Sequence, residues 1–141
     1  MVREVAELEF QALGRKLSDA RKVAGALSFL ANRTQEEFWV LLLDGRHALM
    51  SLAQVSKGTA TSSLVHPREV FGPAVRESAA AVIVAHNHPS GDPNPSVEDR
   101  EVTRRLRAAA DLIGIPLLDH VVLGSEGAFY SFAQSGDEAF K

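Results

Sequence analysis

Residues 79–99 read AAAVIVAHNHPSGDPNPSVED, and this stretch is the most informative part of the chain. Its first seven residues form an unbroken apolar run, which is typical of a strand covered on both faces. Prolines and a glycine interrupt residues 89–95, so the strand cannot continue there and the chain must turn. Ser96 is a favoured N-cap residue, which predicts that a helix begins directly after the turn. The stretch therefore predicts a buried strand joined to a helix by a polar loop.

The rest of the chain alternates between strand and helix patterns on both sides of this unit. We expect strands over 37–43, 47–55, 80–87, 116–123 and 128–132, and helices over 19–31, from Pro67 and from Ser96. Strands and helices that alternate around one sheet predict the α/β (α+β) class in a single unit. We expect an N-terminal helical extension over 1–17, the domain over 18–133 and a polar C-terminal tail over 134–141.

Length and composition limit the possible functions. A chain of 141 residues fits one domain. Its net charge of -3 argues against a domain built mainly to bind nucleic acid, which usually carries a basic excess. The absence of cysteine excludes disulfides, thiolate zinc sites and a cysteine nucleophile, and it suits a reducing cytoplasm. No signal peptide and no apolar run of about 18 residues is present, so we expect a cytoplasmic protein without a membrane span.

Two histidines and an acid in the central stretch form a candidate metal site. Side chains two residues apart on a strand point to the same face, so His86 and His88 share a face with Cα atoms about 6.6 Å apart. Ser96 and Asp99 share the inner face of the helix start, because they are three residues apart. The loop turns the chain back, which lets Asp99 reach both histidines. Two His and one Asp are a typical ligand set for a catalytic zinc ion that keeps one position open for water.

The same helix start also has a structural interpretation. Ser96 and Asp99 match a capping-box pattern, in which Ser96 caps the helix and Asp99 favours the helix dipole. Both interpretations are compatible, because capping uses an oxygen lone pair of Ser96 and leaves the hydroxyl proton free.

These motifs resemble a known family. The pattern His86-x-His88-Pro89 followed by Ser96-x-x-Asp99 is similar to the signature of the JAMM metalloproteases, the MPN+ or JAB domain. Three further strings resemble the RadC branch of that family: HNHPSGDP over 86–93, HPREVF over 66–71 and LDH over 118–120.

The resemblance covers residues 18–133 and implies a single JAB-like domain, in which helices flank a mixed central sheet. It also implies zinc as the cofactor. RadC proteins usually carry an N-terminal helix-hairpin-helix region that binds DNA. Residues 1–36 are too few for such a region, so we expect this chain to lack it, and a DNA-binding role is not favoured.

The resemblance further implies a general base and a donor for the oxyanion. The JAMM pattern has a Glu at the start of a strand about fifty residues before the first His, where Glu36 and Glu37 both stand. Strand parity cannot choose between them, because both faces of that strand are apolar. The RadC-like string places the acid two residues before a Phe, which selects Glu36 because Phe38 follows. The resemblance assigns the oxyanion contact to the Ser96 hydroxyl.

The leading hypothesis is a zinc-dependent hydrolase that uses a metal-activated water to cleave peptide or isopeptide bonds in a protein or peptide substrate. The alternative is a nucleic-acid-binding accessory protein of DNA repair, which the net acidity disfavours. For the remaining histidines and for three arginines we expect structural roles. We expect His66 at the entry of a helix, His47 in a solvated turn, and His120 in the core or in contact with a ligand. We expect Arg104, Arg105 and Arg107 on a solvated helix face.

Overall fold

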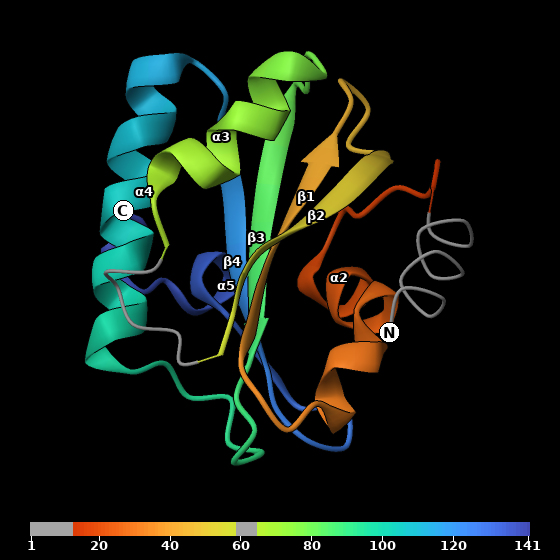
Figure 1. The fold of residues 1–141 in the computed structure, drawn as a ribbon, viewed down its shortest axis with the longest axis vertical. Coiled ribbons are helices and arrows are strands. Elements are labelled where there is room, and N and C mark those ends of the chain that lie inside the picture. Colours follow the sequence, from red (N-terminus) through yellow and green to blue (C-terminus); the bar gives the residue numbers. More distant parts are fainter. Residues whose placement is uncertain (1–12, 59–64) are drawn as a thin grey trace.

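The fold is built on one five-stranded sheet (Figure 1). The structure is a computed structural model and describes residues 13–58 and 65–141. The strands are β1 (Glu37–Leu43), β2 (Leu49–Lys57), β3 (Ala81–Asn87), β4 (Leu117–Leu123) and β5 (Phe129–Ser131). Their order is β2-β1-β3-β4-β5; β3 and β4 are parallel, and every other neighbouring pair is antiparallel. The predicted α/β class with a mixed sheet is confirmed.

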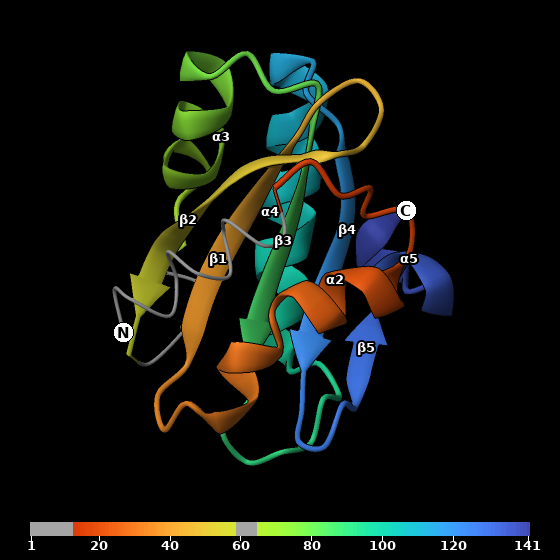
Figure 2. The same cartoon turned by 90° about the vertical axis from the view of Figure 1, so that its right-hand side faces the viewer.

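Helices cover both faces of this sheet, as Figures 1 and 2 show from two directions. One face carries α3 (Pro67–Arg76) and α4 (Val97–Ile113), and the other carries α2 (Ala20–Ala26) and the 3-10 helix η1 (Ser28–Asn32). Side chains of β1 alternate between the two cores: Phe38, Val40 and Leu42 pack on the α3/α4 side, and Trp39, Leu41 and Leu43 pack on the α2 side. Both faces of β1 are buried, which explains the unbroken apolar sequence of residues 38–43.

The same alternation sets the direction of the β3 side chains. Val82 and Val84 belong to the core on the α3/α4 side, whereas Ile83 and Ala85 belong to the core on the α2 side. His86 continues the first series, so its ring lies on the face that α4 covers.

The N-terminal part differs from the sequence prediction. The helix expected over 19–31 ends at Ala26 and is followed by η1, because the tighter 3-10 spacing directs both Leu27 and Leu30 into the core, where each is 0% exposed. Of the helical extension expected over 1–17, residues 1–12 lie outside the described part of the chain. The remainder is not helical: Gly14 adopts a left-handed φ of +80°, and Lys16 forms a β-bridge with Ala48.

The C-terminal residues pack against the domain. Residues 132–141 form α5 (Phe132–Ser135) and the 3-10 helix η2 (Glu138–Phe140). Asp137 anchors this segment, because its Oδ2 accepts hydrogen bonds from Tyr130 Oη at 2.7 Å and from Arg100 Nε of α4 at 3.2 Å. Ala139 is also buried. Of the polar tail predicted over 134–141, Asp137 and Ala139 thus pack against the domain. Across residues 13–58 and 65–141, every helix is too short or too polar to cross a membrane.

Candidate metal centre

The three predicted ligands meet at the end of β3. His86 is the next-to-last residue of that strand, His88 follows its end, and Asp99 lies in the first turn of α4. Asp99 Oδ1 lies 3.0 Å from His86 Nε2, and Asp99 Oδ2 lies 3.0 Å from His88 Nε2. The two Nε2 atoms are 3.1 Å apart. The loop between strand and helix therefore brings the carboxylate against both imidazoles.

The spacing and chemistry of these atoms fit a small divalent cation. Donors bound to a tetrahedral zinc ion at about 2.0–2.1 Å lie about 3.3 Å from one another, which is close to the separations of the three side chains. Imidazole nitrogen and carboxylate oxygen are also donors that zinc accepts. The ligand atoms of Glu36, His86 and His88 all lie within 4.8 Å of one another. These residues, with Asp99 in contact with both imidazoles, form a group that can hold a metal ion.

The electrostatics of the group favour a positive charge between the side chains. Burial alone would raise the pKa of the Asp99 carboxyl, but hydrogen bonds with His86 and His88 hold that pKa well below its usual range. The hydrogen bond with Asp99 in turn raises the pKa of His88 above its ordinary value of 6.5. A metal ion bound between these side chains would supply the positive charge that a proton on His88 supplies without it.

The two candidate bases occupy different environments. Glu36 Oε1 lies 3.9 Å from His88 Nε2, and the Glu36 side chain is 25% exposed at the edge of the ligand group. Glu37 is 1% exposed, and its Oε1 accepts hydrogen bonds from Trp39 Nε1 at 3.2 Å and from Gln54 Nε2 at 3.0 Å. Glu37 is therefore engaged in contacts that hold the sheet, and Glu36 is the acid that lies beside the predicted ligands.

The register of the sheet places Glu36 there. Strands β1 and β3 are antiparallel, with Phe38 opposite His86. The residue two positions before Phe38 therefore lies near the residue two positions after His86, on the same face of the sheet. This geometry pairs Glu36 with His88, although fifty-two positions separate them in the chain.

Asn87 fixes the backbone around Glu36. Its side chain is directed away from the two flanking histidines and is 1% exposed. Asn87 Oδ1 accepts a hydrogen bond from Glu37 N at 2.7 Å, and Asn87 Nδ2 donates to Gln35 O at 3.1 Å. The peptide groups on both sides of Glu36 are thus tied to the strand that carries the histidines. Sequence reasoning missed this role; its only signal was an Asn at the end of a strand, where that residue type is disfavoured.

Ser96 forms the predicted capping box with Asp99. Ser96 Oγ accepts a hydrogen bond from Asp99 N at 3.1 Å, and Ser96 N donates to Asp99 Oδ2 at 2.8 Å. The cap therefore orients the carboxylate that contacts both imidazoles. It leaves the hydroxyl proton of the exposed Ser96 available, and the oxyanion contact of this residue stays a prediction.

The other histidines match their structural expectations. His66 is the N-cap residue of α3 and makes no side-chain capping bond. His47 is exposed in the β1–β2 turn with a φ of +62°. His120 is fully buried, and its Nε2 lies 2.8 Å from His86 Nδ1, so it contacts a predicted ligand from the side remote from Asp99.

The arginines of α4 match only in part. Arg104 and Arg105 are exposed, as a solvated helix face requires. Arg107 instead lies over the ring of Phe140, with its Cζ 4.4 Å from the ring centroid. That side of the helix is covered by the C-terminal segment.

A cavity of about 280 Å³ opens beside the acid. Its lining residues come from the segment before β1 and from the residue after β2: Thr34, Gln35, Glu36 and Gly58. The cavity gives space on the exposed side of Glu36.

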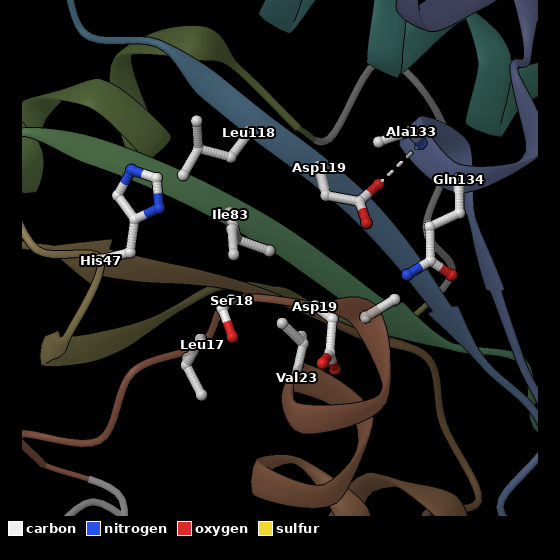
Figure 3. Close-up of a pocket in the computed structure, with 11 residues that line it drawn as sticks. Leu17, Ser18, Asp19, Val23, His47, Ile83, Leu118, Asp119, Ala133 and Gln134 are labelled. Carbon is white, nitrogen blue, oxygen red and sulfur yellow. Dashed lines mark hydrogen bonds between the residues drawn. The ribbon is translucent and has the colours of Figure 1, made fainter.

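A second cavity, of about 200 Å³, lies on the opposite face of the sheet between α2 and β4 (Figure 3). Ile83 and Asp119 line it, and the Asp119 carboxylate accepts a hydrogen bond from Ala133 N at 3.0 Å. Burial raises the pKa of Asp119. Because Ile83 and His86 project from opposite faces of β3, this cavity is not part of the metal centre.

Two curated proteins that this chain is similar to carry names without a stated activity. A UPF0758 protein of Geobacter sulfurreducens is 59% identical over 105 residues, which are 74% of this chain and 45% of that protein. A UPF0758 protein of Geotalea uraniireducens is 48% identical over 127 residues, which are 90% of this chain and 55% of that protein. The chain thus spans about half the length of the curated relatives it matches.

The family comparison gives the same assignment as the motifs. The model of the RadC-like JAB domain matches residues 17–137, which include every residue of the candidate centre and most of the C-terminal segment. The chain therefore belongs to the RadC-like JAB domain family.

Proposed function

We propose that this domain is a zinc-dependent hydrolase of the JAMM type that cleaves peptide or isopeptide amide bonds. The observation that carries the proposal is the contact of the His86 and His88 imidazoles with the Asp99 carboxylate. A second carboxylate oxygen, Glu36 Oε1, lies 3.9 Å from His88 Nε2 at the exposed edge of this group. His86, His88 and Asp99 would hold the ion. When bound, zinc supplies a Lewis acid that polarises a carbonyl and lowers the pKa of a water molecule to about 7.

Glu36 is the proposed general base. Its Oε1 takes a proton from the attacking water as the water oxygen bonds to the amide carbon. It then returns that proton to the amine as the carbon–nitrogen bond breaks, so no other proton donor is needed. The partly exposed position of Glu36 suits this role, because the carboxylate can reach both the ligand group and the neighbouring cavity.

Ser96 is the proposed donor to the developing oxyanion. The capping bond occupies an oxygen lone pair, so the hydroxyl proton can be directed toward substrate. Loss of one such donor typically lowers kcat by about 10²–10³. The substrate of the proposed reaction is a protein or peptide.

The test is a cleavage screen with peptide and isopeptide substrates, combined with elemental analysis of bound metal. The matched pair of variants is Glu36→Gln and Glu37→Gln, which change neighbouring acids in the same way. We expect Glu36→Gln to keep its zinc and to lose about 10²–10⁴ in rate. Glu37→Gln keeps an oxygen that can accept from Trp39 and Gln54, so it should retain cleavage with a modest loss of stability.

Two outcomes contradict the proposal. Unchanged cleavage by Glu36→Gln would exclude this residue as the base. Absence of zinc and of cleavage in the wild-type protein, with DNA binding that weakens steeply as salt rises, would instead support the nucleic-acid-binding alternative.

A further inference from the structure

His120 is a buried histidine whose two ring nitrogens both have partners. Its Nε2 lies 2.8 Å from His86 Nδ1, and its Nδ1 lies 2.6 Å from Thr103 Oγ1. Both His120 and Thr103 are 0% exposed. The His120 ring also stacks on Phe132, with centroids 4.8 Å apart and an interplanar angle of 14°. The ring is therefore held between β3, α4 and the C-terminal segment, and it has no room to turn.

The direction of each hydrogen bond follows from the chemistry of Thr103. Its hydroxyl has one proton, and Oγ1 donates to the carbonyl oxygen of Asp99 at 2.7 Å, since a carbonyl can only accept. With that proton committed, Oγ1 can only accept from His120 Nδ1, so the proton of the neutral ring lies on Nδ1. His120 Nε2 then carries a lone pair and accepts from His86 Nδ1. The proton of His86 is therefore on Nδ1.

We infer that His120 and Thr103 are positioning residues that fix His86 in the Nδ1–H tautomer, with the lone pair of Nε2 directed at Asp99 and His88. The relay runs from the backbone carbonyl of Asp99 through Thr103 and His120 to His86. It therefore links the proposed ligands Asp99 and His86 through the interior of the domain. The orientation of the His86 ring on β3 is thus set by residues of α4 and β4.

His88 reaches the same tautomer by a simpler route. Its Nδ1 lies 2.8 Å from the carbonyl oxygen of Asp92, so Nδ1 must donate and Nε2 carries the lone pair. Both Nε2 lone pairs then face each other at 3.1 Å beside a carboxylate. The contact of each Nε2 with the Asp99 carboxylate is a hydrogen bond only when a proton lies on that Nε2. Neutral rings fixed in this way repel each other and the carboxylate unless a cation, either a proton or a metal ion, lies between them. Partners that fix the tautomer of a metal-bound histidine typically change metal affinity by about 10–100-fold when they are removed.

The inference is tested first on the zinc-free protein, by long-range ¹H–¹⁵N NMR of the imidazole rings at a pH where they are neutral. We expect His86 in the wild type to carry its proton on Nδ1. Thr103→Val removes the hydroxyl with little change of shape, and it should give His86 a mixture of tautomers. Thr103→Ser keeps the hydroxyl and should restore the wild-type spectrum. Leu106→Val, a buried change one turn further along α4, controls for loss of stability and should leave the tautomer unchanged.

Zinc affinity, measured by competition with a chromophoric chelator, gives a second result. Thr103→Val should bind zinc about 10–100-fold more weakly than the wild type, and Thr103→Ser should match the wild type. A wild-type His86 with its proton on Nε2, or a Thr103→Val variant with the wild-type tautomer and zinc affinity, would overturn the inference. The link to zinc rests on the proposed function, but the NMR result does not. Wild-type protein with the expected tautomer and no zinc binding would support the relay and overturn the proposed function.

Discussion

The substitution Asn87→Ala tests how the domain holds its proposed base. Asn87 is 1% exposed and makes two hydrogen bonds to the chain around Glu36. The bond to Gln35 O contributes about 1 kcal/mol, and the buried Glu37 N–H that loses its acceptor costs about 1–3 kcal/mol. We therefore expect the free energy of unfolding to fall by about 2–4 kcal/mol. Because Glu36 is then less constrained, we also expect cleavage to slow by up to about 10²-fold.

The assay compares urea unfolding, zinc content and cleavage rate for Asn87→Ala and for Asn94→Ala. Asn94 lies exposed in the loop that follows β3, so the control removes the same side chain where its loss is expected to change stability by no more than about 0.5 kcal/mol. Zinc content should stay at the wild-type level in both variants. Equal stability of the two variants would refute the energetic reasoning. A destabilised Asn87→Ala variant with wild-type cleavage would refute the positioning of Glu36.

Three further predictions concern the ligands and the C-terminal segment. Asp99→Ala should lose its equivalent of zinc in elemental analysis, and retention of a full equivalent would show that the ligand set is wrong. In zinc-free protein, the raised pKa of His88 gives a stabilisation that is fully present below about pH 6.5 and is lost as the pH rises through the folded-state value. Urea unfolding at about pH 6 and about pH 9 measures this, and a higher stability at pH 9 would contradict it. Asp137→Ala removes the acceptor of Tyr130 and Arg100, so thermal or urea unfolding should show a loss of about 1–2 kcal/mol, and wild-type stability would contradict the anchoring role.

Local physics made much of the fold predictable from the sequence. Buried strands carry unbroken apolar runs, and these placed β1 exactly over 37–43 and β3 within one residue of its observed start. A Ser followed three residues later by an acid placed the start of α4, because capping is a contact within one turn. The meeting of the three proposed ligands was predictable for the same reason, since strand, loop and helix start lie within fourteen residues.

The remaining features depend on contacts between distant segments. Parity along β1 could not separate Glu36 from Glu37, because the choice needs the pairing of Phe38 with His86. The partner of Asn87 Oδ1 is fifty positions away. The packing of the C-terminal segment could not be predicted from its polar composition, because the Asp137 carboxylate finds its partners on α4 and β5.

The neighbours of β3 also matter while the chain is being synthesised. Glu36 precedes β3 in the chain. The strand parallel to β3, which is β4, and the ring of His120 on it both follow the proposed ligand Asp99. A chain that has not yet emerged from the ribosome as far as β4 therefore contains all the proposed ligands without the strand that supports His86. The proposed metal centre is therefore complete only once β4 has joined the sheet, and an unfinished polypeptide lacks the support that His120 gives to His86.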